Sequence, residues 1–149
     1  MSLLNGKSVK AILSYLWQLP QHLLGLALIF ITGAKKSGYQ TESNSDVVWF
    51  WKYEPKNRFT RYLSGASLGR YIVLPRNAAT WSTVMHEHGH SIQSRWLGPL
   101  YLLAIGIPSV CNNLYDRYAH KTWDFESRVA WYYGRYPEKQ ADKLGGVNR

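Results

Sequence analysis

Apolar residues at helical spacing dominate the start of the chain. Between residues 8 and 18 they recur at intervals of three and four, which places them on one side of a helix opened by Ser8: Val9, Ile12, Leu13, Leu16 and Trp17. Pro20 ends this helix and begins a second one, which runs to about Ile31 and is apolar almost all round after His22. Such a helix is either buried or in contact with lipid, and we interpret His22 as a capping or core histidine.

The pattern then changes to that of loops and strands. Residues 33–45 are polar and predict an exposed loop, whereas residues 46–53 are rich in β-branched and aromatic side chains and predict a strand. After a turn at 54–57, residues 59–63 and 68–74 predict two further short strands. Together these segments predict a small antiparallel sheet.

A long helix should follow this sheet. Asn77 and Thr80 are both suitable N-caps for a helix over about residues 79–96, and Gly98 followed by Pro99 is a typical helix end. The histidine-rich motif described below therefore falls in the middle of a helix.

The remaining chain predicts two more helices, around residues 124–134 and 137–144, after an apolar segment to Pro108 and a polar stretch. A length of 149 residues suffices for one modest core but not for two. We therefore expect a single α+β domain over residues 1–149, with helices flanking the small antiparallel sheet.

Charge and cysteine content narrow the function classes. A net charge of +9 favours anionic partners, but no nucleic-acid-binding motif accompanies it, so we expect no nucleic-acid partner. Cys111 is the only cysteine, which excludes an intrachain disulfide and a multi-thiolate zinc site. Any metal must therefore be held mainly by histidine and carboxylate ligands.

The N-terminal segment carries no clear signal peptide, because no small-residue cleavage site follows its apolar run. The two most apolar stretches, Leu23–Ile31 and Leu100–Ile107, are about half the ~20 residues that a spanning helix needs. A full span is not expected, but an amphipathic segment over residues 1–33 would allow peripheral membrane contact. These features favour a cytoplasmic or membrane-associated location.

The chemistry centres on His86-Glu87-His88-Gly89-His90, which contains the pattern His-Glu-x-x-His. Residues four apart share one face of a helix, so His86 and His90 can bind a single zinc ion, and Glu87 lies where it can hold a metal-bound water. A zinc ion is therefore the expected cofactor. His88 is about 160° round the helix and is expected to be packed or exposed rather than ligating.

A catalytic zinc site needs a third protein ligand and an open position for water. An extended histidine motif is excluded because Gln93 and Trp96 stand where it needs glycine and histidine. The ligand should then be a later glutamate, and only Glu126 and Glu138 lie downstream. The weaker candidates are Asp116, His120 and Asp124.

Glu138 is the preferred third ligand, with Glu126 as the alternative. Pro137 fixes the start of a helix at Glu138, and Asp142 lies four residues on along the same face. Asp142 can there accept the ring N–H of a metal-bound histidine. The competing interpretation makes Glu138 a charge at a helix N-terminus and Asp142 a solvated partner of Lys139.

His86-Glu87-His88-Gly89-His90 together with Glu138-x-x-Ala141-Asp142 resembles the gluzincin metallopeptidases. The resemblance implies a zincin-like fold in which His86, His90 and Glu138 hold zinc, Glu87 is the general base, and a sheet edge aligns a peptide or protein substrate. The tract from His90 to Leu102 also resembles small uncharacterised bacterial zincin-like proteins.

Peptide-bond hydrolysis by a zinc-activated water is thus the leading function, and an inactive zinc-binding or membrane-peripheral module is the alternative. Tyr132, Tyr133 and Tyr136 are candidate oxyanion donors. Gly89 weakens its helix by roughly 1 kcal/mol relative to alanine, which indicates a close approach or a packing constraint there.

Overall fold

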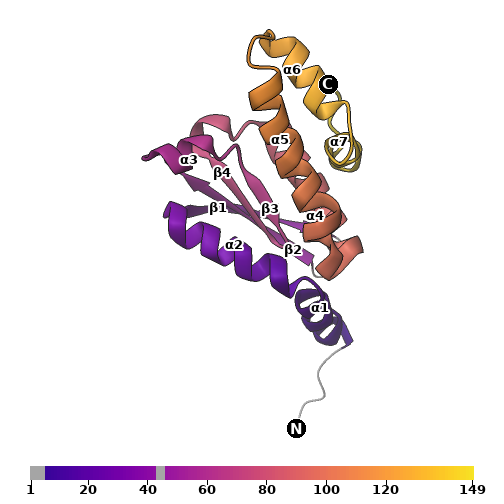
Figure 1. Ribbon diagram of the computed structural model, residues 1–149. Coiled ribbons are helices and arrows are strands. Elements are labelled where there is room, and N and C mark those ends of the chain that lie inside the picture. The colour runs from indigo at the N-terminus through magenta and orange to yellow at the C-terminus, as the bar shows by residue number, and fades with distance from the viewer. Residues whose placement is uncertain (1–5, 43–45) are drawn as a thin grey trace.

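The computed structural model describes residues 6–42 and 46–149 (Figure 1). The described residues form seven α-helices, three short helical turns and four strands. In chain order they are α1 (Gly6–Trp17), α2 (Leu19–Thr32), β1 (Lys35–Glu42), β2 (Asp46–Tyr53), α3 (Arg58–Tyr62), β3 (Ala66–Leu68), β4 (Tyr71–Pro75), η1 (Arg76–Ala78), α4 (Trp81–Leu97), η2 (Gly98–Leu100), η3 (Leu102–Gly106, a π-helix), α5 (Ile107–Ala119), α6 (Phe125–Tyr133) and α7 (Glu138–Gly145). The expected α+β class is confirmed.

The sheet is mixed, so the prediction of an antiparallel sheet was wrong for one of its pairings. Its strand order is β1-β2-β4-β3, with β1 and β3 each antiparallel to its neighbour and β2 parallel to β4. The chain leaves β2, passes through α3 and the edge strand β3, and turns back so that β4 enters between β2 and β3. This crossover makes β4 run in the direction of β2.

Two local predictions in this region were also wrong. Most of the expected loop at 33–45 is strand β1, an edge strand that tolerates polar residues because it pairs on one side only; residues 43–45 lie outside the described part. The expected strand at 59–63 is instead helix α3. Asn57 accepts the N–H of Thr60 and forms a capping box with it, which starts the helix.

The other elements lie close to their predicted positions. Strand β2 has the predicted bounds, and the segment 68–74 divides at Gly69, whose φ of 64° makes the turn between β3 and β4. Helix α4 begins as expected after Thr80, whose side chain accepts the N–H of Thr83. The polar stretch after Pro108 is part of α5.

The sheet supports the helices through a small core. Five residues of β2 and β4 are almost fully buried: Val48, Tyr53, Ile72, Val73 and Leu74. In the view of Figure 1 the strands lie between α2 and the group α4 to α7. Helices α2 and α4 both contact β3 and β4, and α7 packs along α4.

Helices α1 and α2 form a bent N-terminal pair. Among the described residues, no single helix has the length and apolarity needed to cross a membrane. The segments Val9–Trp17 and Leu19–Thr32 meet that criterion only when taken together, and they are bent by 75° with respect to each other.

Candidate metal centre

Helix α4 carries the motif residues on its buried side. His86 and His90 are four residues apart, and their ring centroids lie 4.7 Å from each other. The two histidines are only 3% and 5% exposed, and Glu87 is 8% exposed. The helical spacing thus brings both imidazoles into one small buried space, with a carboxyl group beside them.

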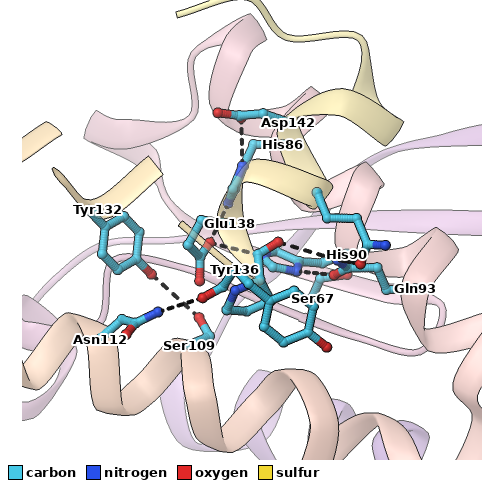
Figure 2. A network of polar contacts seen from close by, with 12 residues as sticks. Ser67, His86, His90, Gln93, Ser109, Asn112, Tyr132, Tyr136, Glu138 and Asp142 are labelled. Atoms are coloured by element: carbon cyan, nitrogen blue, oxygen red, sulfur yellow. Dashed lines mark hydrogen bonds and ion pairs between the residues drawn. The ribbon is translucent and has the colours of Figure 1, made fainter. Parts of the chain in front are cut away.

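Glu138 enters the same space from the first turn of α7, as Figure 2 shows. Its Oε2 lies 2.9 Å from Nε2 of His86 and 3.0 Å from Nε2 of His90. One ligand atom from each of these three residues lies within 4.8 Å of the other two, so the group could hold a metal ion. The preferred set of His86, His90 and Glu138 is therefore brought together by the fold.

Two glycines let α7 approach α4 closely enough for this. A Cβ at Gly89 would lie 1.9 Å from the carbonyl oxygen of Ala141, and a Cβ at Gly145 would lie 2.0 Å from that of Met85. Neither position can take a larger residue unless the helices move apart. The close approach that Gly89 suggested in the sequence is thus confirmed, and its partner is α7.

The other ring nitrogen of each histidine is also held. Nδ1 of His86 lies 2.8 Å from Oδ1 of Asp142, and Nδ1 of His90 lies 2.7 Å from Oε1 of Gln93 (Figure 2). Both acceptors leave Nε2 directed at Glu138, which is the orientation that a metal ligand needs. The expected contact of Asp142 with a motif histidine is confirmed.

Gln93 was missed as a contributor to the site. Besides accepting from His90, its amide nitrogen donates to Oε1 of Gln140 at 2.8 Å and to the carbonyl of Pro137 at 3.3 Å. Residues three apart are neighbours on a helix, so Gln93 lies next to the ring of His90. This spacing could have predicted the contact from the sequence.

The carboxylate of Glu138 and the imidazole of His86 stabilise each other's charged forms. Burial raises the pKa of Glu138, but its hydrogen bonds with His86 and His90 lower it more, and the net pKa lies far below its usual range. Burial lowers the pKa of His86, but its hydrogen bonds with Asp142 and Glu138 and the charge of Glu87 raise it, to about 9. A metal ion bound at Nε2 of His86 would therefore displace a proton.

The pKa of Glu87 shifts in the opposite direction to that of Glu138. Burial raises the pKa of Glu87, and the charges of His90 and His86 oppose this only in part. A carboxyl group whose pKa is raised by burial is suited to take up and release a proton.

The donor set fits a metal ion in one further respect. Oε1 of Glu138 is buried, and no hydrogen-bond partner for it is found among residues 6–42 and 46–149. A buried carboxylate oxygen without a partner is costly, and coordination of a cation would satisfy it. Two imidazole nitrogens and a carboxylate form a donor set that zinc accepts.

The alternative ligands lie elsewhere. Glu126 is exposed on α6, and Asp124 caps that helix through the N–H of Ser127. Asp116 contacts His120 at 3.2 Å and pairs with Arg128 at 2.6 Å. None of these candidates belongs to the group formed by His86, His90 and Glu138.

The three candidate tyrosines differ in their contacts. The ring of Tyr133 meets that of His86 edge-on at 5.0 Å between centroids, whereas the hydroxyl of Tyr136 donates to the carbonyl of Ala104. The hydroxyl of Tyr132 lies 3.4 Å from Oγ of Ser109, and burial and then the charge of Glu138 raise its pKa. Tyr132 therefore stays a protonated donor beside the site, as drawn in Figure 2.

His88 is buried at 6% exposure, and its carbonyl accepts the hydroxyl of Ser91. It does not join the ligand group. A groove of about 720 Å³ between α6 and α7 is lined by Tyr133 and Asp142, both of which contact His86, but not by the three ligand residues themselves.

Comparison of the chain with protein-family models, with curated proteins and with solved structures finds no match in any of the three. The structure itself shows an α+β fold with a small mixed sheet, and a buried group that could hold a metal ion.

Proposed function

We propose that the chain is a zinc-dependent metallopeptidase of the gluzincin type, with a zincin-like arrangement of helices and sheet. The observation that carries the proposal is the convergence of His86, His90 and Glu138, with Glu87 buried beside them. Three protein ligands leave one position of a tetrahedral zinc ion for water or substrate, whereas structural zinc sites commonly fill all four positions, often with cysteine.

Bound zinc would polarise the scissile carbonyl and make the attacking water more acidic. Glu87 takes the proton of that water and passes it to the leaving amine, a role supported by its raised pKa. Asp142 and Gln93 keep the two imidazoles in the ligating orientation. The hydroxyl of Tyr132 is the donor we assign to the developing oxyanion, because it is half-buried near Glu138 and stays protonated.

A catalytically inactive zinc-binding module is the second candidate function. The observation that favours it is burial, since His86, His90 and Glu138 are at most 5% exposed. The groove between α6 and α7 reaches Tyr133 and Asp142 rather than the ligands. A peptide substrate would need a route that opens between α6, α7 and the sheet.

The variant Glu87→Gln separates these two functions. Purified wild-type chain loaded with zinc should cleave an internally quenched peptide mixture, and Glu87→Gln should lower that rate by about 10²–10⁴-fold with unchanged zinc content by mass spectrometry. The matched control is Glu126→Gln, which changes an exposed glutamate and should retain the wild-type rate.

Three outcomes would count against the proposal in different ways. Activity retained in Glu87→Gln would remove Glu87 as the base. A zinc-loaded wild type that cleaves no peptide would support the inactive module. A protein purified from zinc-replete buffer without bound zinc would refute the metal centre.

A further inference from the structure

The start of helix α2 has the opposite polarity to that of a helix in a water-exposed domain, whereas its C-terminal half packs Leu28 and Ile29 against the core. Its inner side and N-cap position bury Gln18, Gln21 and His22 completely. Its outer side exposes six large apolar side chains, from 38% for Leu19 to 87% for Phe30; the others are Leu23, Leu24, Leu26 and Ile31. A helix on a water-exposed surface normally turns its apolar side to the core.

Helix α1 continues this exposed apolar surface. Four residues of the stripe that the sequence places on one side of the helix face outward, with exposures between 40% and 60%: Val9, Ile12, Leu13 and Leu16. Trp17 is 50% exposed, but its ring also lies against Gly98 of the domain. The opposite side of α1 contacts the domain, because Arg70 donates to the carbonyl of Ala11 and Tyr15 stacks on His22. We call the exposed apolar residues of α1 and α2 together the N-terminal apolar face.

Polar contacts fix the orientation of this face. Oγ of Ser94 donates to Oε1 of Gln18 at 2.9 Å, and the amide of Gln21 donates to the carbonyl of Gly98. The indole N–H of Trp17 donates to the carbonyl of Arg95 at 3.1 Å. These partners on α4 and η2 hold the polar side of α2 inward, so the apolar side is left outward by specific bonding. An exposed apolar face of this size marks an interaction surface.

The charges around the face favour an anionic bilayer as its partner. Residues 1–41 contain no aspartate or glutamate, and their lysines lie at both ends of the helical pair: Lys7, Lys10, Lys35 and Lys36. The whole chain carries a net charge of +9. Lysines beside an exposed apolar helix are the arrangement that binds anionic lipid surfaces.

We propose that the N-terminal apolar face docks the domain on an anionic lipid bilayer, with the exposed apolar side of α2 lying in the interface of one leaflet and its buried side kept on the domain. Helix α2 has 14 residues and so measures about 21 Å, less than the roughly 30 Å of a hydrocarbon core. Helices satisfy their own backbone hydrogen bonds, which allows this placement. This proposal does not depend on the peptidase activity.

The test compares two equally bulky and exposed side chains, Phe30 on the face and Phe125 on α6, at 87% and 79% exposure. Flotation of the full chain with vesicles of phosphatidylcholine alone, and of phosphatidylcholine with phosphatidylglycerol, measures the bound fraction. The anionic vesicles should bind more wild type, and Phe30→Glu should weaken that binding by about tenfold or more while Phe125→Glu leaves it unchanged. Circular dichroism checks that both variants are folded.

Any of three results would overturn the proposal. The first is no flotation with either vesicle composition, and the second is equal loss of binding in Phe30→Glu and Phe125→Glu. The third is light scattering of a stable dimer that Phe30→Glu converts to monomer without an effect on vesicle binding, which would assign the face to a second copy of the chain.

Discussion

Helices α2 and α4 both bury polar side chains, but they use them differently. On α4 several of the buried groups are ionisable, and two of them meet an ionisable group of α7: His86 and His90 face Glu138 at about hydrogen-bond distance. On α2 the buried amides of Gln18 and Gln21 meet a serine hydroxyl and a backbone carbonyl. The first arrangement forms a charged site, and the second attaches a helix.

The difference shows how a candidate functional site can be distinguished from a contact that only holds a helix in place. Hydrogen bonds between neutral groups fix a helix in place and change little with protonation. The carboxylate of Glu138 helps to raise the pKa of His86, and it can bind a cation in place of a proton. Burial of polar residues alone does not identify a functional site, but the type of partner does.

Removal of the shared carboxylate should have the largest effect. Glu138→Ala takes away one of three proposed ligands, so zinc affinity should fall by more than the roughly 10–100-fold typical of a lost contact to a ligand. Glu126→Ala, the matched change of an exposed glutamate on α6, should leave affinity at the wild-type level. Competition against a fluorescent zinc chelator measures both. Equal affinity of the two variants would exclude Glu138 as a ligand.

A substitution that pushes α7 away from α4 should have the next largest effect, on both stability and zinc affinity. In Gly89→Ala the new methyl group would meet the carbonyl of Ala141, and relief of that clash should cost about 1–3 kcal/mol of unfolding free energy, or more if α7 undocks. Zinc affinity should fall as well. The measurement is urea unfolding, followed by circular dichroism.

Gly106→Ala is the control for this change. A Cβ at Gly106 would make only ordinary contacts, the nearest at 3.8 Å to Leu102, so the variant should be unchanged or slightly more stable. If both alanine variants unfold at the same urea concentration, the close packing of α4 on α7 is not what limits stability.

The contact between α2 and α4 should have the smallest effect. Ser94→Ala leaves Oε1 of Gln18 buried without its donor and should cost about 1–2 kcal/mol, with zinc affinity unchanged. Ser82→Ala, on the same helix, removes only a solvent-exposed contact with Thr80 and should have less effect on stability. A drop in zinc affinity in Ser94→Ala would show that this contact and the site are not independent.

The sequence predicted the parts that depend on local spacing. The face shared by His86 and His90 and the contact of Asp142 follow from helical periodicity, and the structure has both. Of the two N-cap candidates chosen by residue type, Asn77 and Thr80, the structure uses Thr80. Glu138 could be preferred over Glu126 because a helix start with Pro137 has a recognisable pattern, and Glu138 is the residue that reaches both histidines.

The features that were not predicted depend on tertiary pairing or on a competing local signal. The parallel pairing of β2 with β4 depends on the path of the chain through α3, which no strand pattern records. Strand β1 is polar enough to resemble a loop and gains its partner only in the sheet. At residues 59–63 the capping box at Asn57 prevailed over β-propensity. The outward direction of the apolar stripe of α1 could not be read from its periodicity.

The distance along the chain between the two halves of the site has a consequence for biosynthesis. Glu138 lies 48 residues after His90 and 52 after His86. During translation, α4 with its two histidines is synthesised before α7. The three ligand atoms can therefore meet only once α7 has been made and has docked on α4 through Gly89 and Gly145. Metal bound by all three ligands would therefore indicate that α7 has docked.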